Sequence, residues 1–434
     1  MNVGFVHLGC SKNLIDTEMA IGVFKNNNFT IVNDVKQAEI IVINTCGFID
    51  SAKQEAIDTI LEMAEYKKKG KCKYLVVMGC LVQRYYKELI KSLPEVDLFI
   101  PISNYNNFWE EIQKLINVNK STGMLNYIDR VIATGNTTAY LKIAEGCSNR
   151  CTYCAIPYIR GPFVSRTMED ILEEAFGLAK KGYKEIILIA QDTTKYGIDI
   201  YGEPKLAKLL EELCKIKEFK WIRFLYSYPE SITDELIETV KNNEKICKYF
   251  DIPVQHISDR VLKRMNRKTT GKDIIEKVDK IKTKIPEAIL RTSLIVGFPG
   301  ETEDEFNELY NFVKMGKFDK IGVFEYSKED GTPAARLPEQ IHYKTKRRRY
   351  NKIMECAKET SKEKLKSNIG ITYEVLVENK SLNGKYYIGR TYMDIPDTDG
   401  MVFINCAKDL KAGTWVKCKI VDTKEYDLIG EVCN

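Results

Sequence analysis

The stretch GCSNRCTYC, residues 146–154, contains three closely spaced cysteines and decides how the rest of the chain is interpreted. Cys147, Cys151 and Cys154 are separated by three and then two residues, so their thiolates can converge on one metal centre. A structural zinc ion usually takes four ligands as two separated pairs, and no fourth Cys or His lies nearby. Three thiolates instead suit a four-iron cluster that keeps one iron open. A zinc knuckle or a set of buried thiols is the alternative.

The residues around this motif favour the cluster. The triplet follows a strand-like run, AYLKIAEG (139–146), and the aromatic Tyr153 lies directly before the last cysteine. The stretch resembles the radical S-adenosylmethionine (SAM) enzymes, whose CxxxCxxC loop follows the first strand of a partial barrel. The resemblance implies that the open iron binds the amino and carboxylate groups of SAM, with Tyr153 contributing to the SAM site. One electron would then cleave the sulfonium to give a 5′-deoxyadenosyl radical, a step that belongs to the cofactor.

The composition indicates a globular protein of the cytoplasm. A chain of 434 residues is expected to form roughly two to four domains. No apolar run approaches the roughly 20 residues needed to span a bilayer, and the N-terminal MNVGFVHLGC predicts no signal peptide. In such a chain, 13 cysteines point to metal or redox use rather than to disulfides. The net charge of +5 is too small to indicate a nucleic-acid partner.

Residues 1–117 repeat a pattern of apolar run, cysteine and helix, which predicts a parallel sheet flanked by helices. The runs NVGFVHLG, EIIVINT and KYLVVMG end at Cys10, Cys46 and Cys80 and lead into helices predicted at 11–26, 49–69 and 82–92; a last helix is predicted at 106–116. Ligands bind along the carboxyl edge of such a sheet. We therefore expect these three cysteines to meet in space as a second three-cysteine cradle, although each alone could be a buried thiol.

A segment rich in Gly, Thr and Asn (118–139) is interpreted as a linker into a central domain at 133–364. Six strand-like runs follow one another there: AYLKIAEG, KEIILIAQD, WIRFLYSYP, FDIPVQ, ILRTSLIVG and KIGVFEYS, with helices predicted at 168–181, 205–214, 233–241, 271–284 and 303–315. Six β–α repeats predict a partial (βα)6 barrel, an incomplete form of the eightfold barrel, with its working face at the carboxyl ends of the strands.

Polar residues and a glycine at these strand ends are candidates for holding SAM: Gln191, Ser227, Gln255 and Gly297. A glycine lets the backbone approach a ligand closely. A polar residue at a strand end can equally hydrogen-bond the loop backbone, so both interpretations stay open for each. His256 is interpreted as a structural histidine, with proton handling as the alternative.

The last part of the chain changes character. A helix is predicted at 345–367 with a strongly basic side, which is either a solvated face or an RNA or ribosome contact. From residue 365 to 434 short alternating strands predict a small five-stranded barrel of oligonucleotide-binding style. This barrel carries ten acidic and eight basic residues between 374 and 431. A surface that grips phosphates should be basic, so the barrel suits a basic protein partner at least as well.

Two three-cysteine cradles, a six-repeat SAM barrel and a terminal TRAM-like barrel together resemble the methylthiotransferases along essentially the whole chain. LGCSKNLIDTE (8–18), DIPVQHISDRVLKRM (251–265), FEYSKEDGTPAARLPEQI (324–341) and GRTYMDIPDTDG (389–400) are similar to the branch that modifies an aspartate of small-subunit ribosomal protein number twelve. The other branch modifies an adenosine of tRNA beside the anticodon and usually has Gln-Ser where this chain has Gln255-His256.

The resemblance implies two 4Fe-4S clusters with different tasks. The cluster on Cys147, Cys151 and Cys154 would generate the radical from SAM. The cluster on the three N-terminal cysteines would deliver the sulfur, which a second SAM methylates. The ribosomal protein and an electron-donor protein are the expected partners, with no membrane and with tRNA as the less favoured substrate. A zinc-containing RNA-binding protein without catalysis is the alternative from another class.

Overall fold

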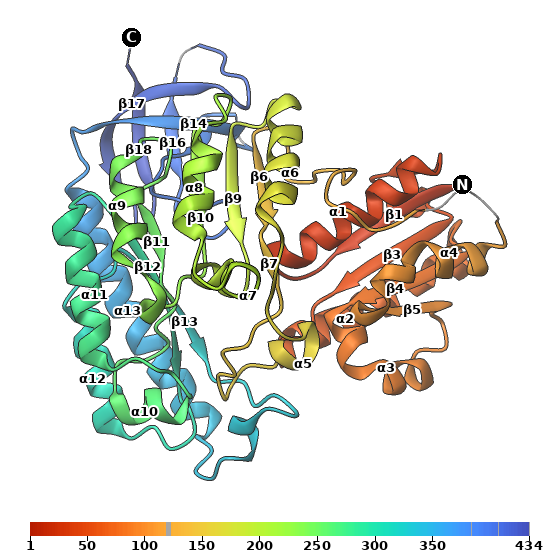
Figure 1. Ribbon diagram of the computed structural model, residues 1–434, viewed down its shortest axis with the longest axis horizontal. Helices are drawn as coiled ribbons and strands as arrows, with labels where there is room; N and C mark the ends of the chain where they lie inside the picture. The colour runs from red at the N-terminus through yellow and green to blue at the C-terminus, as the bar shows by residue number, and fades with distance from the viewer. Residues whose placement is uncertain (119–122, 383, 407, 434) are drawn as a thin grey trace. The chain divides into compact units, whose positions relative to one another are not determined.

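The computed structural model describes residues 1–118, 123–382, 384–406 and 408–433 (Figure 1). Residues 119–122 of the predicted linker and residues 383, 407 and 434 of the predicted terminal barrel therefore lie outside the described residues. The chain divides into two compact units. The first consists of Met1–Lys181, Ile189–Gln191 and Ser327–Ala335, and the second of Gly182–Leu188, Asp192–Tyr326 and Arg336–Asn434.

A five-stranded parallel sheet forms the N-terminal part of the first unit, as the sequence predicts. Its order is β2-β1-β3-β4-β5, with β1 (Asn2–His7), β2 (Thr30–Val32), β3 (Ile40–Thr45), β4 (Tyr74–Gly79) and β5 (Leu98–Pro101). Only the three central strands, β1, β3 and β4, are predicted from the sequence. The edge strands β2 and β5 are three and four residues long, which is too short to show a strand period.

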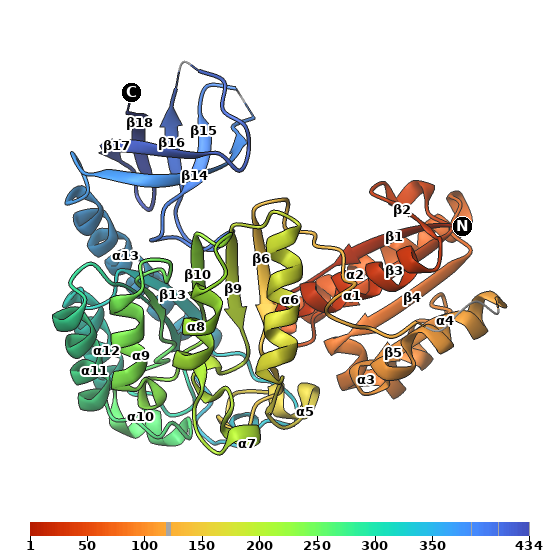
Figure 2. The same ribbon diagram turned by 45° about the horizontal axis from the view of Figure 1, so that its top comes forward.

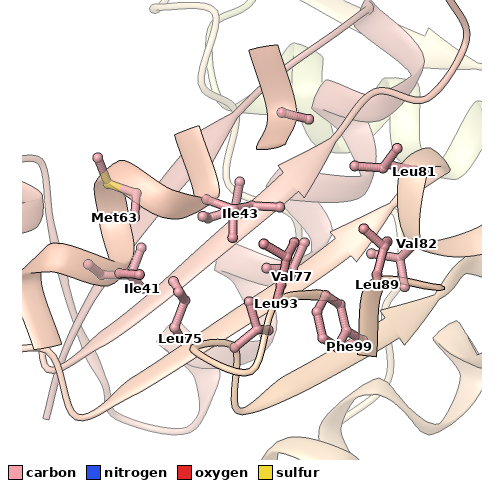
Figure 3. Close-up of a cluster of buried hydrophobic side chains, with 14 of the residues drawn as sticks. Ile41, Ile43, Met63, Leu75, Val77, Leu81, Val82, Leu89, Leu93 and Phe99 are labelled. Atoms are coloured by element: carbon pink, nitrogen blue, oxygen red, sulfur yellow. The ribbon is translucent and has the colours of Figure 1, made fainter. Parts of the chain in front are cut away.

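Helices cover both faces of this sheet because both faces of its central strands are apolar. Along β3, Ile40 and Val42 belong to one buried cluster and Ile41 and Ile43 to the other, the pattern of a strand buried on two sides. The four helices are α1 (Ser11–Asn26), α2 (Asp50–Lys69), α3 (Cys80–Ser92) and α4 (Phe108–Ile116). α1 and α4 pack on the first face, and α2 and α3 pack on the second. Figure 3 shows the buried cluster on the second face.

The rest of the first unit carries the central cysteine loop. It contains β6 (Thr138–Lys142), β7 (Ala144–Glu145), α5 (Ile156–Arg160), β8 (Val164–Ser165) and α6 (Met168–Lys180), and β7 pairs with β8. Part of the predicted linker is packed here rather than solvated. Arg130 is only 2% exposed, donates to Glu174 at 2.7 Å and forms an ion pair with Glu18.

The second unit holds the other five strands predicted for the central domain. They are β9 (Glu185–Ile189), which ends in the first unit, β10 (Trp221–Phe224), β11 (Tyr249–Asp251), β12 (Ile289–Val296) and β13 (Lys320–Glu325). β9 pairs in parallel with β10, and β12 pairs in parallel with β11 and β13. The predicted helices are present as α8 (Leu206–Cys214), α9 (Asp234–Asn242), α11 (Gly271–Lys284) and α12 (Glu303–Lys314), and the short α7 (Ile198–Tyr201) and α10 (Asp259–Arg264) were not predicted.

The second unit ends in a long helix and a closed barrel (Figure 2). The helix is α13 (Tyr343–Lys366), and the barrel order is β14-β15-β16-β18-β17, with β14 (Thr372–Lys380), β15 (Tyr387–Arg390), β16 (Val402–Asn405), β17 (Trp415–Thr423) and β18 (Leu428–Val432). Several basic residues of α13 are neutralised within this unit: Arg348 pairs with Glu303 at 2.7 Å, and Lys364 pairs with Asp319 at 2.8 Å. Over the described ranges, every helix is too short or too polar to cross a bilayer.

Candidate active site

The carboxyl edge of the N-terminal sheet gathers three cysteines. Cys10 is the residue before α1, Cys46 follows β3, and Cys80 begins α3 directly after β4. β3 lies between β1 and β4 in the sheet, and the three strands end within one residue of one another: His7 pairs with Asn44, and Thr45 pairs with Gly79. Adjacent parallel strands that end together place the residues following them side by side. The structure therefore brings together the three cysteines whose proximity the strand–cysteine–helix pattern predicts.

Two glycines show how closely the cysteine loops approach one another. A β-carbon on Gly9 would lie 3.0 Å from the Cβ of Cys46, and one on Gly47 would lie 2.7 Å from the backbone of Leu81. Only a residue without a side chain fits such an approach. Burial raises the pKa of Cys80 to about 11, where the neighbouring thiolates add to the increase and the charge of Arg160 opposes it.

By its chemistry, a set of three thiolates suits an iron–sulfur cluster that keeps one iron open. No three His, Cys, Asp or Glu side chains among the described residues are spaced to hold one metal ion. Each thiolate of a cluster binds a different iron, so the sulfurs stand further apart than around one ion. Cys10 is exposed while Cys80 is buried, so the cradle opens on one side. Loading requires each thiol to lose its proton.

The central cysteine triplet lies in the same compact unit, between β7 and α5. Burial raises the pKa of Cys154 to about 12, the charges of Cys151 and Cys147 add to the effect, and the charge of Lys12 opposes it. Lys12 lies in the first turn of α1, two residues beyond Cys10, so the start of α1 lies close enough for its charge to act on the second cradle.

Side-chain packing also joins the two cysteine loops. Cys80 packs with Ala155, the residue after Cys154, and with Ile159 of α5 in one buried cluster. Both cysteine triplets thus belong to one packed region of the first unit.

A buried guanidinium lies between the two cysteine loops. Arg160, the last residue of α5, donates to the Sγ of Cys80 at 3.5 Å and to the Oδ1 of Asn13. Its Nη1 pairs with Asp16 at 2.8 Å and with Glu145 at 3.2 Å. The Asn13 side chain also accepts from the Cys80 thiol at 3.3 Å. One arginine therefore contacts a cysteine of the first cradle and a carboxylate beside the second.

Glu145 extends this network toward Cys147. Its Oε1 accepts from the backbone N of Gly146 at 3.2 Å and from the Nε2 of Gln191 at 3.1 Å. Its Oε2 accepts from the Nζ of Lys142 at 2.8 Å. Burial would raise the pKa of Glu145, but the charges of Lys142 and Arg160, with the hydrogen bonds from Lys142 and Gln191, lower it to about 2. Glu145 is therefore a carboxylate at neutral pH.

The residues predicted to hold SAM fall into both units. Tyr153 and Gln191 belong to the first, and Ser227, Gln255 and Gly297 to the second. The Oε1 of Gln191 and the Oγ of Ser227 are buried and find no hydrogen-bond partner among the described residues. The amide oxygen of Gln191 could accept from a bound ligand, and the hydroxyl of Ser227 could accept or donate.

The last two candidates have unusual backbone conformations. Gln255 has a φ of 70° and exchanges backbone hydrogen bonds with Ser293 and Ile295 of β12. Gly297 has a φ of 72°, and its amide donates to Glu301. The roles of these five residues in SAM binding remain predictions.

Sequence reasoning missed the charged and polar residues around the cysteines: Asn13, Asp16, Lys142, Glu145 and Arg160. A signal existed for two of them. Lys142 and Glu145 interrupt the otherwise apolar run AYLKIAEG, and a charge in a buried strand requires a partner.

Three family models match successive parts of the chain. Residues 2–101 match Uncharacterized protein family UPF0004, residues 141–313 match the Radical SAM superfamily, and residues 369–433 match the TRAM domain. The radical SAM match indicates an iron–sulfur cluster and SAM as cofactors.

Solved structures with low sequence identity share the fold. The radical SAM methyltransferase TsrM from Kitasatospora setae superposes with a TM-score of 0.56 at 11% identity, covering 77% of this chain and 73% of TsrM. The cobalamin-dependent SAM radical enzyme OxsB gives a TM-score of 0.52 at 15% identity, covering 83% of this chain and 56% of OxsB.

Full-length relatives are much more similar. The ribosomal protein uS12 methylthiotransferase RimO of Alkaliphilus oremlandii is 62% identical over 100% of this chain and 99% of its own length. RimO of Acetivibrio thermocellus is 49% identical over 100% of this chain and 98% of its own length. The chain therefore belongs to the ribosomal protein uS12 methylthiotransferase family.

Proposed function

We propose that the protein transfers a methylthio group to the β-carbon of an aspartate in ribosomal protein uS12. The observation that carries the proposal is the position of two cysteine triplets in one compact unit, one at three adjacent strand ends and one in a CxxxCxxC loop. We further propose that each triplet holds a 4Fe-4S cluster. The family membership supports both statements, and an acidic terminal barrel, with ten acidic against eight basic residues, suits a basic ribosomal protein.

The chemistry explains why two cradles are needed. An unactivated C–H bond is not acidic enough to be deprotonated at neutral pH, so its hydrogen has to be removed by a radical. When bound, the cluster at Cys147, Cys151 and Cys154 supplies the electron that cleaves SAM, and the cluster at the N-terminal cysteines supplies the sulfur to be transferred.

The chain's own residues position these groups. Cys147 and Cys151 are buried, which keeps water from the radical side of the site. The exposed Cys10 leaves the sulfur-carrying side accessible to a protein substrate. The carboxylate of Glu145 holds the amide of Gly146 and the side chain of Gln191 next to the radical cradle, with the Oε1 of Gln191 left for SAM.

The direct test is an anaerobic incubation of the reconstituted protein with SAM, a reductant and purified uS12. Mass spectrometry of the uS12 peptides should show that one methylthio group replaces one hydrogen on a single aspartate. Parallel incubations use assembled small ribosomal subunits and tRNA, with nucleoside analysis for the tRNA. Modification of tRNA and not of uS12 would contradict the proposed substrate, and a colourless, zinc-containing protein would contradict the proposed chemistry.

One partner of this reaction and its location follow from its stoichiometry and its substrate. Reductive SAM cleavage consumes an electron, so an electron-donor protein is required in the cell. A substrate that is made and assembled into ribosomes agrees with the cytoplasmic location predicted from the sequence.

A further inference from the structure

We propose that Arg160 is a positioning residue of the sulfur-delivering centre, which sets the redox potential of the cluster at Cys10, Cys46 and Cys80. This inference rests on the proposed function, because it requires a cluster at those cysteines. It goes further in assigning a task to a residue outside both cysteine motifs.

The first argument is the direct contact between a fixed cation and one cysteine sulfur. The Nη2 of Arg160 lies 3.5 Å from the Sγ of Cys80, and the side chain of Arg160 is only 2% exposed. A hydrogen bond or a positive charge at a ligand sulfur stabilises the more negative, reduced form of a cluster and raises its potential. Because the guanidinium is buried, solvent screens this effect little.

The second argument is that the guanidinium cannot turn away from the sulfur. Asp16 and Glu145 hold its Nη1 at 2.8 and 3.2 Å, and Asn13 accepts from its Nη2. Asn13 is itself fixed, since its Nδ2 donates to the carbonyl of Thr45 at 3.0 Å, one residue before Cys46. A planar fork held at several points keeps its remaining N–H groups directed at one place.

The third argument is selectivity for one of the two centres. Arg160 reaches the sulfur of Cys80 directly, whereas toward the radical cradle its contact is with the carboxylate of Glu145, two residues before Cys147. The charge of Arg160 therefore acts mainly on the sulfur-delivering centre. The two clusters of this unit would therefore differ in redox potential, and an electron delivered to the protein would not be distributed equally between them.

The test measures the potential of each cluster separately by EPR-monitored redox titration. One background replaces Cys147, Cys151 and Cys154 with alanine and keeps the N-terminal cluster; the other replaces Cys10, Cys46 and Cys80 and keeps the radical cluster. Into each background go Arg160→Gln and Arg160→Lys. The control is Arg166→Gln, because the side chain of Arg166 is 8% exposed and pairs with Asp170 and Glu174 instead of a cysteine.

We expect Arg160→Gln to lower the potential of the N-terminal cluster, Arg160→Lys to lower it less, and Arg166→Gln to leave it unchanged. The radical cluster should keep its potential in all three. An unchanged N-terminal potential in Arg160→Gln, or an equal shift in both clusters, overturns the proposal. If Arg160→Gln does not take up iron, Arg160→Lys decides: a lowered potential supports the role of Arg160 and a wild-type potential overturns it.

Iron analysis of the wild-type protein separates this inference from the proposed function. A wild-type protein that binds iron for one cluster only would contradict the proposed two-cluster chemistry. Two clusters whose potentials do not respond to Arg160→Gln would leave that chemistry intact and contradict only the role of Arg160.

Discussion

Buried charges at the cysteine-bearing edge of the first unit are held as a network rather than as isolated pairs. The side chains of Lys142, Arg160 and Asp16 are each at most 2% exposed, and Asp16 pairs with both cations. Removing one partner of a buried ion pair leaves an uncompensated charge and is strongly destabilising. These residues are therefore under structural constraint even before any cofactor binds.

His256 provides a prediction about pH at the residue scale. It is fully buried, and burial lowers its pKa to about 3; the charge of Glu305 opposes this shift and that of Arg349 adds to it. Its Nδ1 accepts from the amide of Ser258 at 3.0 Å. A histidine that stays neutral in the fold but titrates near 6.5 when unfolded makes the folded state bind fewer protons. Its contribution is complete above pH 6.5 and is lost as the pH falls toward 3.

We expect the free energy of unfolding to fall by about 1.4 kcal/mol between pH 7.5 and pH 5.5 because of this residue. Denaturant unfolding of the wild-type protein and of His256→Gln at both pH values measures the difference. The variant should lose this part of the pH dependence; an equal pH dependence in both proteins would contradict the prediction. A pKa of about 3 also disfavours the alternative that His256 handles protons near neutral pH.

The sequence predicts that the cysteines lie together, but it does not predict the side chains that contact them. The three N-terminal cysteines can be placed together from the strand–cysteine–helix repeat, because parallel strands end at one edge. Arg160 contacts Asn13 across 147 residues and Cys80 across 80 residues. No local pattern encodes such a contact, since it depends on how α5 packs against the sheet edge.

At the scale of elements, the segment 327–335 is linked by hydrogen bonds and ion pairs to the regions of both cysteine loops. The Nη1 of Arg84 donates to the carbonyl of Gly47 at 2.9 Å and to Glu329 at 2.7 Å. Glu329 also pairs with Lys53 at 3.1 Å. At the other end of the segment, the amide of Ala334 donates to the carbonyl of Thr152, between Cys151 and Cys154, at 2.9 Å.

Replacing Glu329 with Gln should therefore destabilise the protein by roughly 3–5 kcal/mol, the usual cost of breaking a buried ion pair. The side chain of Glu329 is 2% exposed, and that of Arg84 is 8% exposed. Denaturant unfolding of the anaerobically purified protein measures the loss. Glu212→Gln is the control, since the Lys208–Glu212 pair lies on the surface. Equal unfolding midpoints for the two variants would show that the ion pairs of Glu329 do not stabilise the protein by this amount.

Element prediction succeeded where the sequence pattern was long. α1 and α11 have the predicted bounds, 11–26 and 271–284, because a helix of several turns shows its period clearly. The predicted strands were too long at their carboxyl ends. β10 ends at Phe224, although its apolar run continues to Pro229, because those residues form the loop at the working edge.

At the scale of the molecule, the terminal barrel and the strands β9 to β13 of the central domain belong to one compact unit, apart from the last residue of β9. Arg390 of β15 pairs with Glu185 of β9 at 2.7 Å and with Glu378 of β14 at 2.6 Å. The rings of Trp221 and Trp415 meet edge to face at 4.4 Å. The boundaries 1–117, 133–364 and 365–434 remain a prediction about domains, because the compact units do not divide the chain at those points.

Arg390→Met should lower the free energy of unfolding by roughly 3–5 kcal/mol, because it leaves the buried Glu185 and the partly exposed Glu378 without this cation. We expect one unfolding transition for the second unit, reported by tryptophan fluorescence, at a lower denaturant concentration. Arg347→Met is the matched control, since Arg347 is 65% exposed and its pair with Glu325 lies near the surface. A separate early transition of the barrel would instead show that the barrel is an independent module.

The most direct test of separate roles for the two cysteine triplets is one incubation of Cys10→Ala with SAM, reductant and uS12. Both 5′-deoxyadenosine and methylthiolated uS12 are quantified from the same sample. If the cluster at Cys147, Cys151 and Cys154 generates the radical alone, 5′-deoxyadenosine still forms while methylthio transfer is abolished. Loss of both products, or of neither, would contradict the division of labour between the two cradles.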